Sequence, residues 1–310
     1  MIRRSPWKDP LLIILAGLLI TELLALGALF WLKPSARGDT NTQYRHARLL
    51  PPGSKGQIKK EGGLHIFLTE KPDGENTDNF ELKTFWLGTD AAGRDYLDRL
   101  LVGARMSLSI GFLGMLVALL MGWGLGTLAG FFGGRTDAVV LWIVQVLWTF
   151  PTVFLALAFS LVLGKGYWTL VLAIGLSLWT ETARVVRGEA LRWKKRLFMD
   201  AAQVLGFSSW RRLLLHLTPN MLPVVLISSV SHFSTAVLLE SGLSFLGLGI
   251  DPPYPSLGNL LAENKIFLFS RERWLVFFPA LILAGNSLMI ILLANRLRDI
   301  LDIRQDPPST

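Results

Sequence analysis

The chain has 310 residues, a formal net charge of +8 and no cysteine. Hydrophobic residues make up 51% of it and its mean hydropathy is +0.45, which is too apolar for a soluble domain of this length. The absence of cysteine excludes disulfides, thiolate metal sites and cysteine nucleophiles. Nucleic-acid binding is the weaker explanation of the positive charge, because no basic soluble domain is there to carry it.

Several apolar segments are long enough to cross a membrane, which takes roughly 20 residues. They are Leu11–Leu32, Ser107–Phe132, Val139–Leu163, Trp168–Val186, Leu222–Leu239 and Trp274–Ala294. The sequence therefore predicts an all-α integral membrane protein with six transmembrane helices. The first helix is expected to be retained, because no small-residue cleavage site follows it. Pro151 is predicted to kink the third helix, and Gly122, Gly126 and Gly130 predict close helix packing in the second.

Lysine and arginine residues near the spans predict the orientation of the chain. Arg3, Arg4 and Lys8 precede the first span, and a dense basic run follows the fourth. Both ends are therefore expected in the cytoplasm. The predicted division is a cytoplasmic N-terminus with the first helix (1–32), an extracytoplasmic loop (33–104), a five-helix core (105–296) with a cytoplasmic loop at 188–220, and a cytoplasmic tail (297–310).

The loop after the first span is polar and unlike the rest of the chain. His65–Thr69 and Phe80–Phe85 alternate in polarity on either side of the turn-rich Lys71–Glu75. This pattern predicts a small β-hairpin on the outer face. A contact with a substrate-delivery protein, a cap over the outer mouth of a pathway and a variable decorative loop are the open interpretations.

The loop between the fourth and fifth spans has residues that favour a defined helical structure. Asp200–Leu205 favours a short helix, and Gly206 suits the left-handed position that ends one. Ser208 or Ser209 can cap a second helix, which a proline at position 219 is predicted to stop. Ala201 and Ala202 offer a small-residue face. A loop that only joins two membrane helices needs none of this, so we interpret it as a docking element.

This loop resembles the EAA coupling loop of ATP-binding-cassette importer permeases. Leu87-Gly-Thr-Asp-Ala-Ala-Gly-Arg-Asp95, Glu240-Ser-Gly-Leu-Ser-Phe-Leu-Gly-Leu-Gly249 and Leu297-Arg-Asp-Ile-Leu-Asp302 narrow the resemblance to the dipeptide/oligopeptide/nickel permease family. It implies a type I importer permease-like fold. The coupling residues that it implies are Glu189, Asp200, Ala201, Ala202, Gly206, Pro219 and Asn220. The residues that it implies as family signature are Gly88, Thr89, Asp90, Gly93, Arg94 and Asp95.

The resemblance also implies an assembly in the cytoplasmic (inner) membrane. A second homologous permease would complete the translocation pathway, and an extracytoplasmic binding protein would deliver the substrate. Two cassette ATPases would bind ATP and Mg, and this chain would bind no cofactor itself. Peptides are the commonest cargo of the family, but nickel and peptide-like compounds are carried by similar chains.

Polar residues within the predicted spans are candidates for the pathway. Ser228, Ser231, His232 and Thr235 recur at helical spacing in the fifth span. They either line an aqueous route or hydrogen-bond to a neighbouring helix. Glu240, which closes this span, is a gate candidate or a helix cap. In the fourth span, Glu181 and Arg184 are spaced to pair with each other.

Enzyme chemistry is not visible in the sequence. It has no phosphate-binding P-loop, no His-Glu-x-x-His and no Gly-x-Ser-x-Gly. The scattered histidines offer no metal site, because none has a second ligand at suitable spacing. The alternative function is a secondary transporter driven by an ion gradient, with Glu22, His232 and Glu240 as carriers. ATP dependence separates the two functions.

Overall fold

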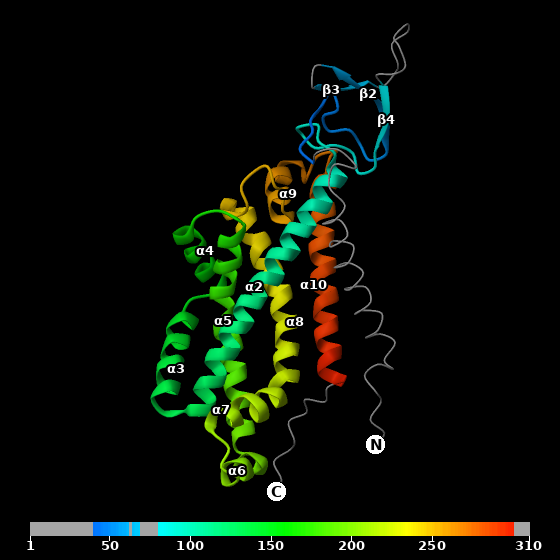
Figure 1. Cartoon of the computed structure of the whole chain (residues 1–310). Coiled ribbons are helices and arrows are strands. Elements are labelled where there is room, and N and C mark those ends of the chain that lie inside the picture. Colours follow the sequence, from blue (N-terminus) through cyan, green and yellow to red (C-terminus); the bar gives the residue numbers. More distant parts are fainter. Residues whose placement is uncertain (1–39, 62–63, 69–79, 301–310) are drawn as a thin grey trace.

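The computed structural model describes residues 40–61, 64–68 and 80–300 (Figure 1). The predicted first span and the turn at Lys71–Glu75 lie outside these residues. Most of the described chain is helical, as predicted. The helices are α2 Tyr96–Phe132, α3 Gly134–Trp148, α4 Thr152–Leu163, α5 Tyr167–Lys194, α6 Leu197–Val204, α7 Ser209–Arg211, α8 Thr218–Leu243, α9 Leu257–Asn264 and α10 Trp274–Ile300. Two π-helical segments, η4 (Arg212–Leu217) and η5 (Ser244–Leu248), flank α8, and a 3₁₀ turn, η6 (Lys265–Phe267), follows α9.

Five of the six predicted spans fall within the described residues. Four helical stretches there are long and apolar enough to cross a membrane, and α3 with α4 makes a fifth if the bent pair is one span. The two helices of this pair meet at 93°, and Pro151 is the N-cap residue of α4. Proline has no N–H to donate and its ring displaces the preceding turn, so the predicted kink is a full break.

The centre of the bundle is the close contact between α2 and α5. A Cβ on Gly122 would lie 2.4 Å from the Thr182 Cβ, and one on Gly126 would lie 2.5 Å from the carbonyl oxygen of Ala183. These glycines therefore let the two backbones approach each other, which confirms the predicted packing. Helices α8 and α10 lie on one side of this pair, and α3 and α4 lie on the other (Figure 1).

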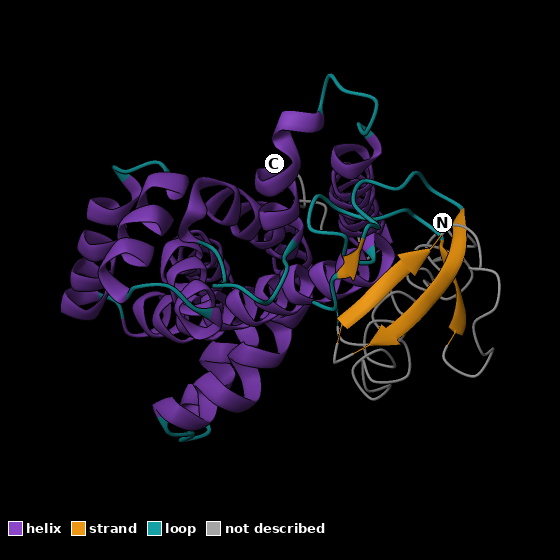
Figure 2. Cartoon of the chain, turned by 90° about the horizontal axis from the view of Figure 1, so that it is seen from above, coloured by secondary structure: helices purple, strands orange, loops and turns teal. Residues whose placement is uncertain are grey.

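A four-stranded sheet stands at the end of the bundle opposite α6 (Figures 1 and 2). Its strands are β1 Tyr44–Arg45, β2 Ser54–Glu61, β3 Leu64–Leu68 and β4 Phe80–Phe85, in the order β1-β3-β2-β4. The predicted hairpin between the third and fourth of these is wrong, because each pairs antiparallel with β2 instead. Strand β2 was missed since its sequence, SKGQIKKE, contains only one of the usual strand formers, Ile58.

A small apolar core holds the sheet to the chain around it. It contains Tyr44, Ala47, Ile58, Phe67 and Phe85. The Phe85 ring packs edge-on against the rings of both Tyr44 and Phe67. The outer insertion is therefore a folded unit with its own core.

Candidate functional site

The segment from the end of α5 to the start of α8, residues 188–220, is called here the coupling segment. Its helix α6 ends at Gly206, which has a φ of +79°. The Phe207 N–H donates to the Ala202 carbonyl at 3.0 Å, which closes the helix end. The Ser208 hydroxyl accepts the N–H of Arg211 at 3.3 Å and caps the next helix. The predicted helix–glycine–helix pattern is confirmed.

Pro219 does not stop the second helix as predicted. The chain passes from α7 through the π-helical η4 into α8 without a break, and the proline lies in the first turn of α8. The wider π turns let the Thr218 N–H bond to the Leu213 carbonyl, so the proline sits where a missing N–H costs little. The Asn220 side chain donates to the His216 carbonyl at 2.6 Å.

The two alanines of the segment do not share one face. Ala201 is exposed, whereas Ala202 is buried inside the chain. The exposed surface is larger and more apolar than the sequence suggested, with Leu197, Val204 and Leu205 exposed by 86%, 88% and 71%. We call these three residues the apolar patch. Such a patch on a protruding segment marks a surface for another protein.

The coupling segment is tied firmly to the bundle. Lys194 donates from Nζ to the Phe131 carbonyl of α2 at 2.6 Å. Met199 of α6 and Leu217 of η4 are buried in one cluster with Phe131. Asp200 is exposed in the first turn of α6, and Glu189 of α5 forms an ion pair with Arg192 at 3.5 Å. The segment is therefore tied to α2 as well as to its two neighbours in sequence.

The polar residues of α8 mostly bond within their own helix. Ser228 donates to the Val224 and Val225 carbonyls, and the Thr235 hydroxyl lies 3.4 Å from the Ser231 carbonyl. Of Ser228, Ser231, His232 and Thr235, only His232 has a polar contact with another helix among the described residues, with its Nδ1 3.6 Å from an Oε of Glu181 on α5. Among the described residues, these hydroxyls therefore do not join α8 to a neighbour.

The predicted pairing of Glu181 with Arg184 is wrong. Glu181 faces His232, whereas the Arg184 guanidinium lies 3.6 Å from the centre of the Trp148 ring on α3. Each of the two side chains thus joins α5 to a different helix. We call His232, Glu181, Arg184 and Trp148, which lie on α8, α5 and α3, the polar strip.

Glu240 is fully buried in a group of serines. Ser244 donates to one carboxylate oxygen at 2.7 Å and Ser241 to the other at 3.2 Å. Ser107 of α2 and Ser256, which caps α9, also hydrogen-bond to the carboxylate. Glu240 therefore joins α2, α8 and α9 rather than capping a helix or facing an opening in this chain.

The six signature residues, from Gly88 to Asp95, build a joint between the sheet, α2 and α9. Gly88 has a φ of +76°, and a Cβ there would lie 2.2 Å from the Leu50 carbonyl oxygen. Gly93 also has a φ of +76°, and a Cβ there would clash with the Tyr44 carbonyl oxygen. Thr89 donates to the Ala47 carbonyl and accepts from the Leu50 N–H.

The centre of this joint is a buried ion network. Asp90 accepts from Arg94 Nε and from Arg99 Nη1, each at 2.7 Å. Arg99 is only 2% exposed and also pairs with Glu263 of α9 at 2.9 Å. The sequence motif contained Asp90 and Arg94 but not Arg99, and Glu263 was missed because it lies far along the chain, in a stretch without a motif.

A second ion pair ties the sheet to the start of α2. Asp95 caps α2 by accepting the Leu97 N–H, and it lies 3.3 Å from Lys83 of β4. Burial lowers the pKa of Lys83, but its hydrogen bond to Tyr44 and the nearby Asp95 carboxylate outweigh burial and raise that pKa above its ordinary value. No three metal-binding side chains gather anywhere in the described part of the chain.

These features define a helical membrane protein with the protruding coupling segment at one end and a folded unit at the other. The family of binding-protein-dependent transport system inner membrane components matches residues 118–306. This is more than half of the chain, so the chain belongs to that family. It is thus a multi-pass inner-membrane permease subunit, not an enzyme; in such transporters separate ATPase subunits hydrolyse ATP.

Individual relatives agree with this assignment. The chain is 35% identical to the oligopeptide transport system permease protein OppC of Bacillus subtilis over 73% of this chain and 74% of the relative. It is 32% identical to the di/tripeptide transport system permease protein DppC of Pseudomonas aeruginosa over 93% of this chain and 87% of the relative. Among solved structures, the inward-facing MetNI methionine ABC transporter shares its fold, with a TM-score of 0.54 and 17% identity over 65% of this chain and 96% of that one.

Proposed function

We propose that this chain is one of two permease subunits of an ATP-driven peptide importer. It forms half of the translocation pathway and couples that pathway to a cytoplasmic ATPase. The observation that carries the proposal is the apolar patch, because three large side chains stand in solvent on a segment that is itself tied to α2. The peptide cargo rests on the names of the relatives, which transport oligopeptides and di- or tripeptides.

The coupling mechanism is a two-state movement biased by a ligand bound elsewhere. Two partner ATPases bind ATP and Mg, and this chain binds neither. Closure of the ATPases moves the coupling segment, in which Glu189, Asp200, Ala201, Ala202, Gly206, Pro219 and Asn220 belong to the docking region. The packing of Met199 and Leu217 against Phe131 carries that movement into the bundle.

The pathway side of the proposal uses the polar strip. A charged or polar side chain within a span faces protein or water rather than lipid. Ser228, Ser231 and Thr235 lie on α8 beside His232, and Glu181 and Arg184 continue the strip on α5. Glu240 holds the outer ends of three helices together and so acts as a pivot of the gate. An external binding protein delivers the substrate to the sheet side, with both chain ends in the cytoplasm.

Gly206→Arg tests the coupling role. The φ of +79° disfavours any side chain, although no atom lies within 4 Å of the position of its Cβ. The variant therefore loses the helix end and places a cation on the docking face without disturbing the bundle. We expect membrane insertion to be normal and peptide uptake to be lost. Gly206→Asn is the matched control, because asparagine tolerates this conformation. Normal uptake by Gly206→Arg would contradict the proposal.

The ion-driven transporter is the other candidate. It predicts uptake that continues without ATP and stops when the proton or sodium gradient is collapsed. The same uptake assay, with vesicles supplied with either ATP or a gradient, separates the two. No contact among the described residues favours this candidate over the importer.

A further inference from the structure

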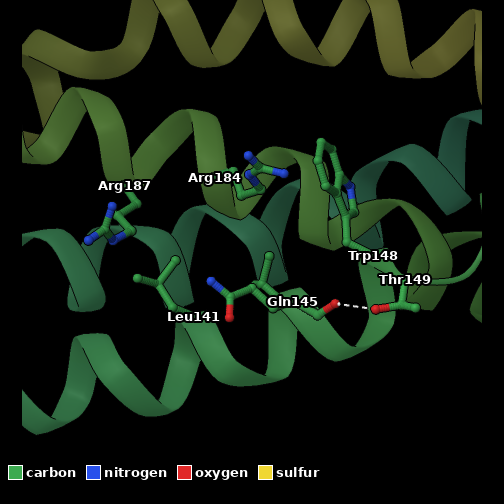
Figure 3. Close-up of a pocket in the computed structure, with 7 residues that line it drawn as sticks. Leu141, Gln145, Trp148, Thr149, Arg184 and Arg187 are labelled. Atoms are coloured by element: carbon green, nitrogen blue, oxygen red, sulfur yellow. Dashed lines mark hydrogen bonds between the residues drawn. The ribbon is translucent and has the colours of Figure 1, made fainter.

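A pocket of about 610 Å³ lies between α3 and α5. Arg184 and Arg187 enter it from α5, whereas Gln145, Trp148 and Thr149 enter it from α3 (Figure 3). Leu141 and Val144 complete its lining. This volume is in the range of small-molecule sites in proteins, which combine apolar walls with a few polar groups.

The two arginines of the pocket differ in how their charges are matched. Arg187 forms a two-point ion pair with Asp137, with the Nη2–Oδ2 distance at 2.6 Å. Arg184 has no carboxylate partner among the described residues, and its one contact is the stacking on Trp148. Stacking uses the face of the guanidinium and leaves the N–H groups at its edge available.

An exposed arginine without a counter-charge is expensive in a membrane span. Arg184 lies two residues before the predicted end of its span at Val186, and the cation–π contact with Trp148 offsets only part of the cost of placing its charge in the membrane. The remaining cost is removed by water or by an anion. The Gln145 and Thr149 side chains are exposed in the same pocket and offer further hydrogen bonds.

The neighbouring charge indicates which kind of anion fits. Glu181 lies one turn from Arg184 on α5, beside His232 and outside the pocket lining, is 37% exposed and carries the opposite charge. A surface that binds anionic lipid carries clustered cations, whereas an acid and a base side by side suit a zwitterion. The polar strip therefore matches a molecule that has both an amino group and a carboxylate.

We propose that this pocket binds the carboxylate end of the transported peptide through Arg184 as the peptide crosses the membrane. The proposal rests on the proposed function and adds a specificity-determining residue to it. Trp148 holds the guanidinium in place, so that its edge presents two parallel N–H donors to the carboxylate.

The test compares two peptides in proteoliposomes that contain the whole transporter with its binding protein. Trialanine and trialanine amide differ only in the carboxylate. We expect Arg184→Gln to lower the uptake ratio of the first to the second by about tenfold relative to the wild-type transporter, which is the usual worth of a charged hydrogen bond. Any preference that the binding protein sets is common to both transporters and cancels in this comparison.

Arg135→Gln is the matched control, because it removes an exposed arginine at the start of α3, outside the pocket. It should leave the ratio unchanged. An unchanged ratio in Arg184→Gln would overturn the pocket proposal while the importer stands. Equal losses for both peptides that follow the phosphatidylglycerol content of the vesicles would overturn it in favour of a lipid. Failure of the wild-type transporter to take up either peptide with ATP would instead count against the proposed function.

Discussion

At the scale of single residues, the signature before α2 is a structural joint. Its glycines have no side chain at positions where backbone segments touch, and its charged residues pair with one another. Asp90 and Arg99 are both almost fully buried, so neither presents a free group to a ligand. The residues that resemble a family motif most closely thus hold the sheet, α2 and α9 together.

Gly88→Ala is predicted to loosen this joint. The φ of +76° costs about 1 kcal/mol for alanine, and the clash of its Cβ with the Leu50 carbonyl at 2.2 Å adds about 2 kcal/mol. Gly53→Ala is the matched control, because its φ is +81° but no atom lies within 4 Å of the added Cβ. We expect a clearly larger fall in melting temperature for Gly88→Ala. Equal falls would show that the close contact does not matter.

At the scale of elements, the coupling segment and α2 are joined by a few short contacts. The bond from Lys194 to the Phe131 carbonyl closes the end of α2, where a helix leaves carbonyls without partners. The π-helical η4 then turns the chain into α8 without a loop. The segment is therefore continuous with the membrane helices on both sides.

Lys194→Met is predicted to weaken coupling rather than folding. The methionine keeps much of the packing but loses the charged hydrogen bond to Phe131, which is worth about 2 kcal/mol. We expect more ATP to be hydrolysed for each peptide transported, by a few-fold. Lys195→Met is the control, since Lys195 is an exposed neighbour of the same charge. A normal ratio of hydrolysis to transport in Lys194→Met would show that this bond plays no part in coupling.

At the scale of the whole molecule, different surfaces are exposed at the two ends. The apolar patch stands at the end with α6, and the sheet stands at the other end (Figure 1). Separate partners are therefore expected at each end. A charge placed on one surface should release one partner only.

Val204→Asp is predicted to release the ATPases. A carboxylate in a buried interface costs several kcal/mol, enough to lower affinity by a factor of at least about 100. We expect pull-down of the tagged chain to recover the second permease without ATPase. Leu82→Asp on the sheet is the control, because Leu82 is 82% exposed at the other end. Retention of ATPase by Val204→Asp would contradict the assignment of the patch.

Local signals made much of this structure predictable from the sequence. The Gly206 turn, the Ser208 cap and the glycines of α2 each depend on one residue type at one backbone position. The errors concern the hydrogen-bonding geometry of a preceding turn, in one case, and distant neighbours in the others. Pro219 is tolerated because a π-helix precedes it, and β2 forms because strands pair with it on both sides. The partners of Glu181 and Arg184 lie on different helices, which helical spacing alone does not reveal.

The length of α2 has a mechanical consequence. It is one unbroken helix of 37 residues, so it measures roughly 55 Å at 1.5 Å per residue, well beyond the roughly 30 Å of the hydrocarbon core. Its lower end receives Lys194 and its upper end carries the ion network around Arg99. Such a rod is a lever: a tilt of about 10° at one end shifts the other by roughly 10 Å. In the proposed importer, a small rotation of α2 at the end near the coupling segment thereby produces a large displacement at the end near the sheet.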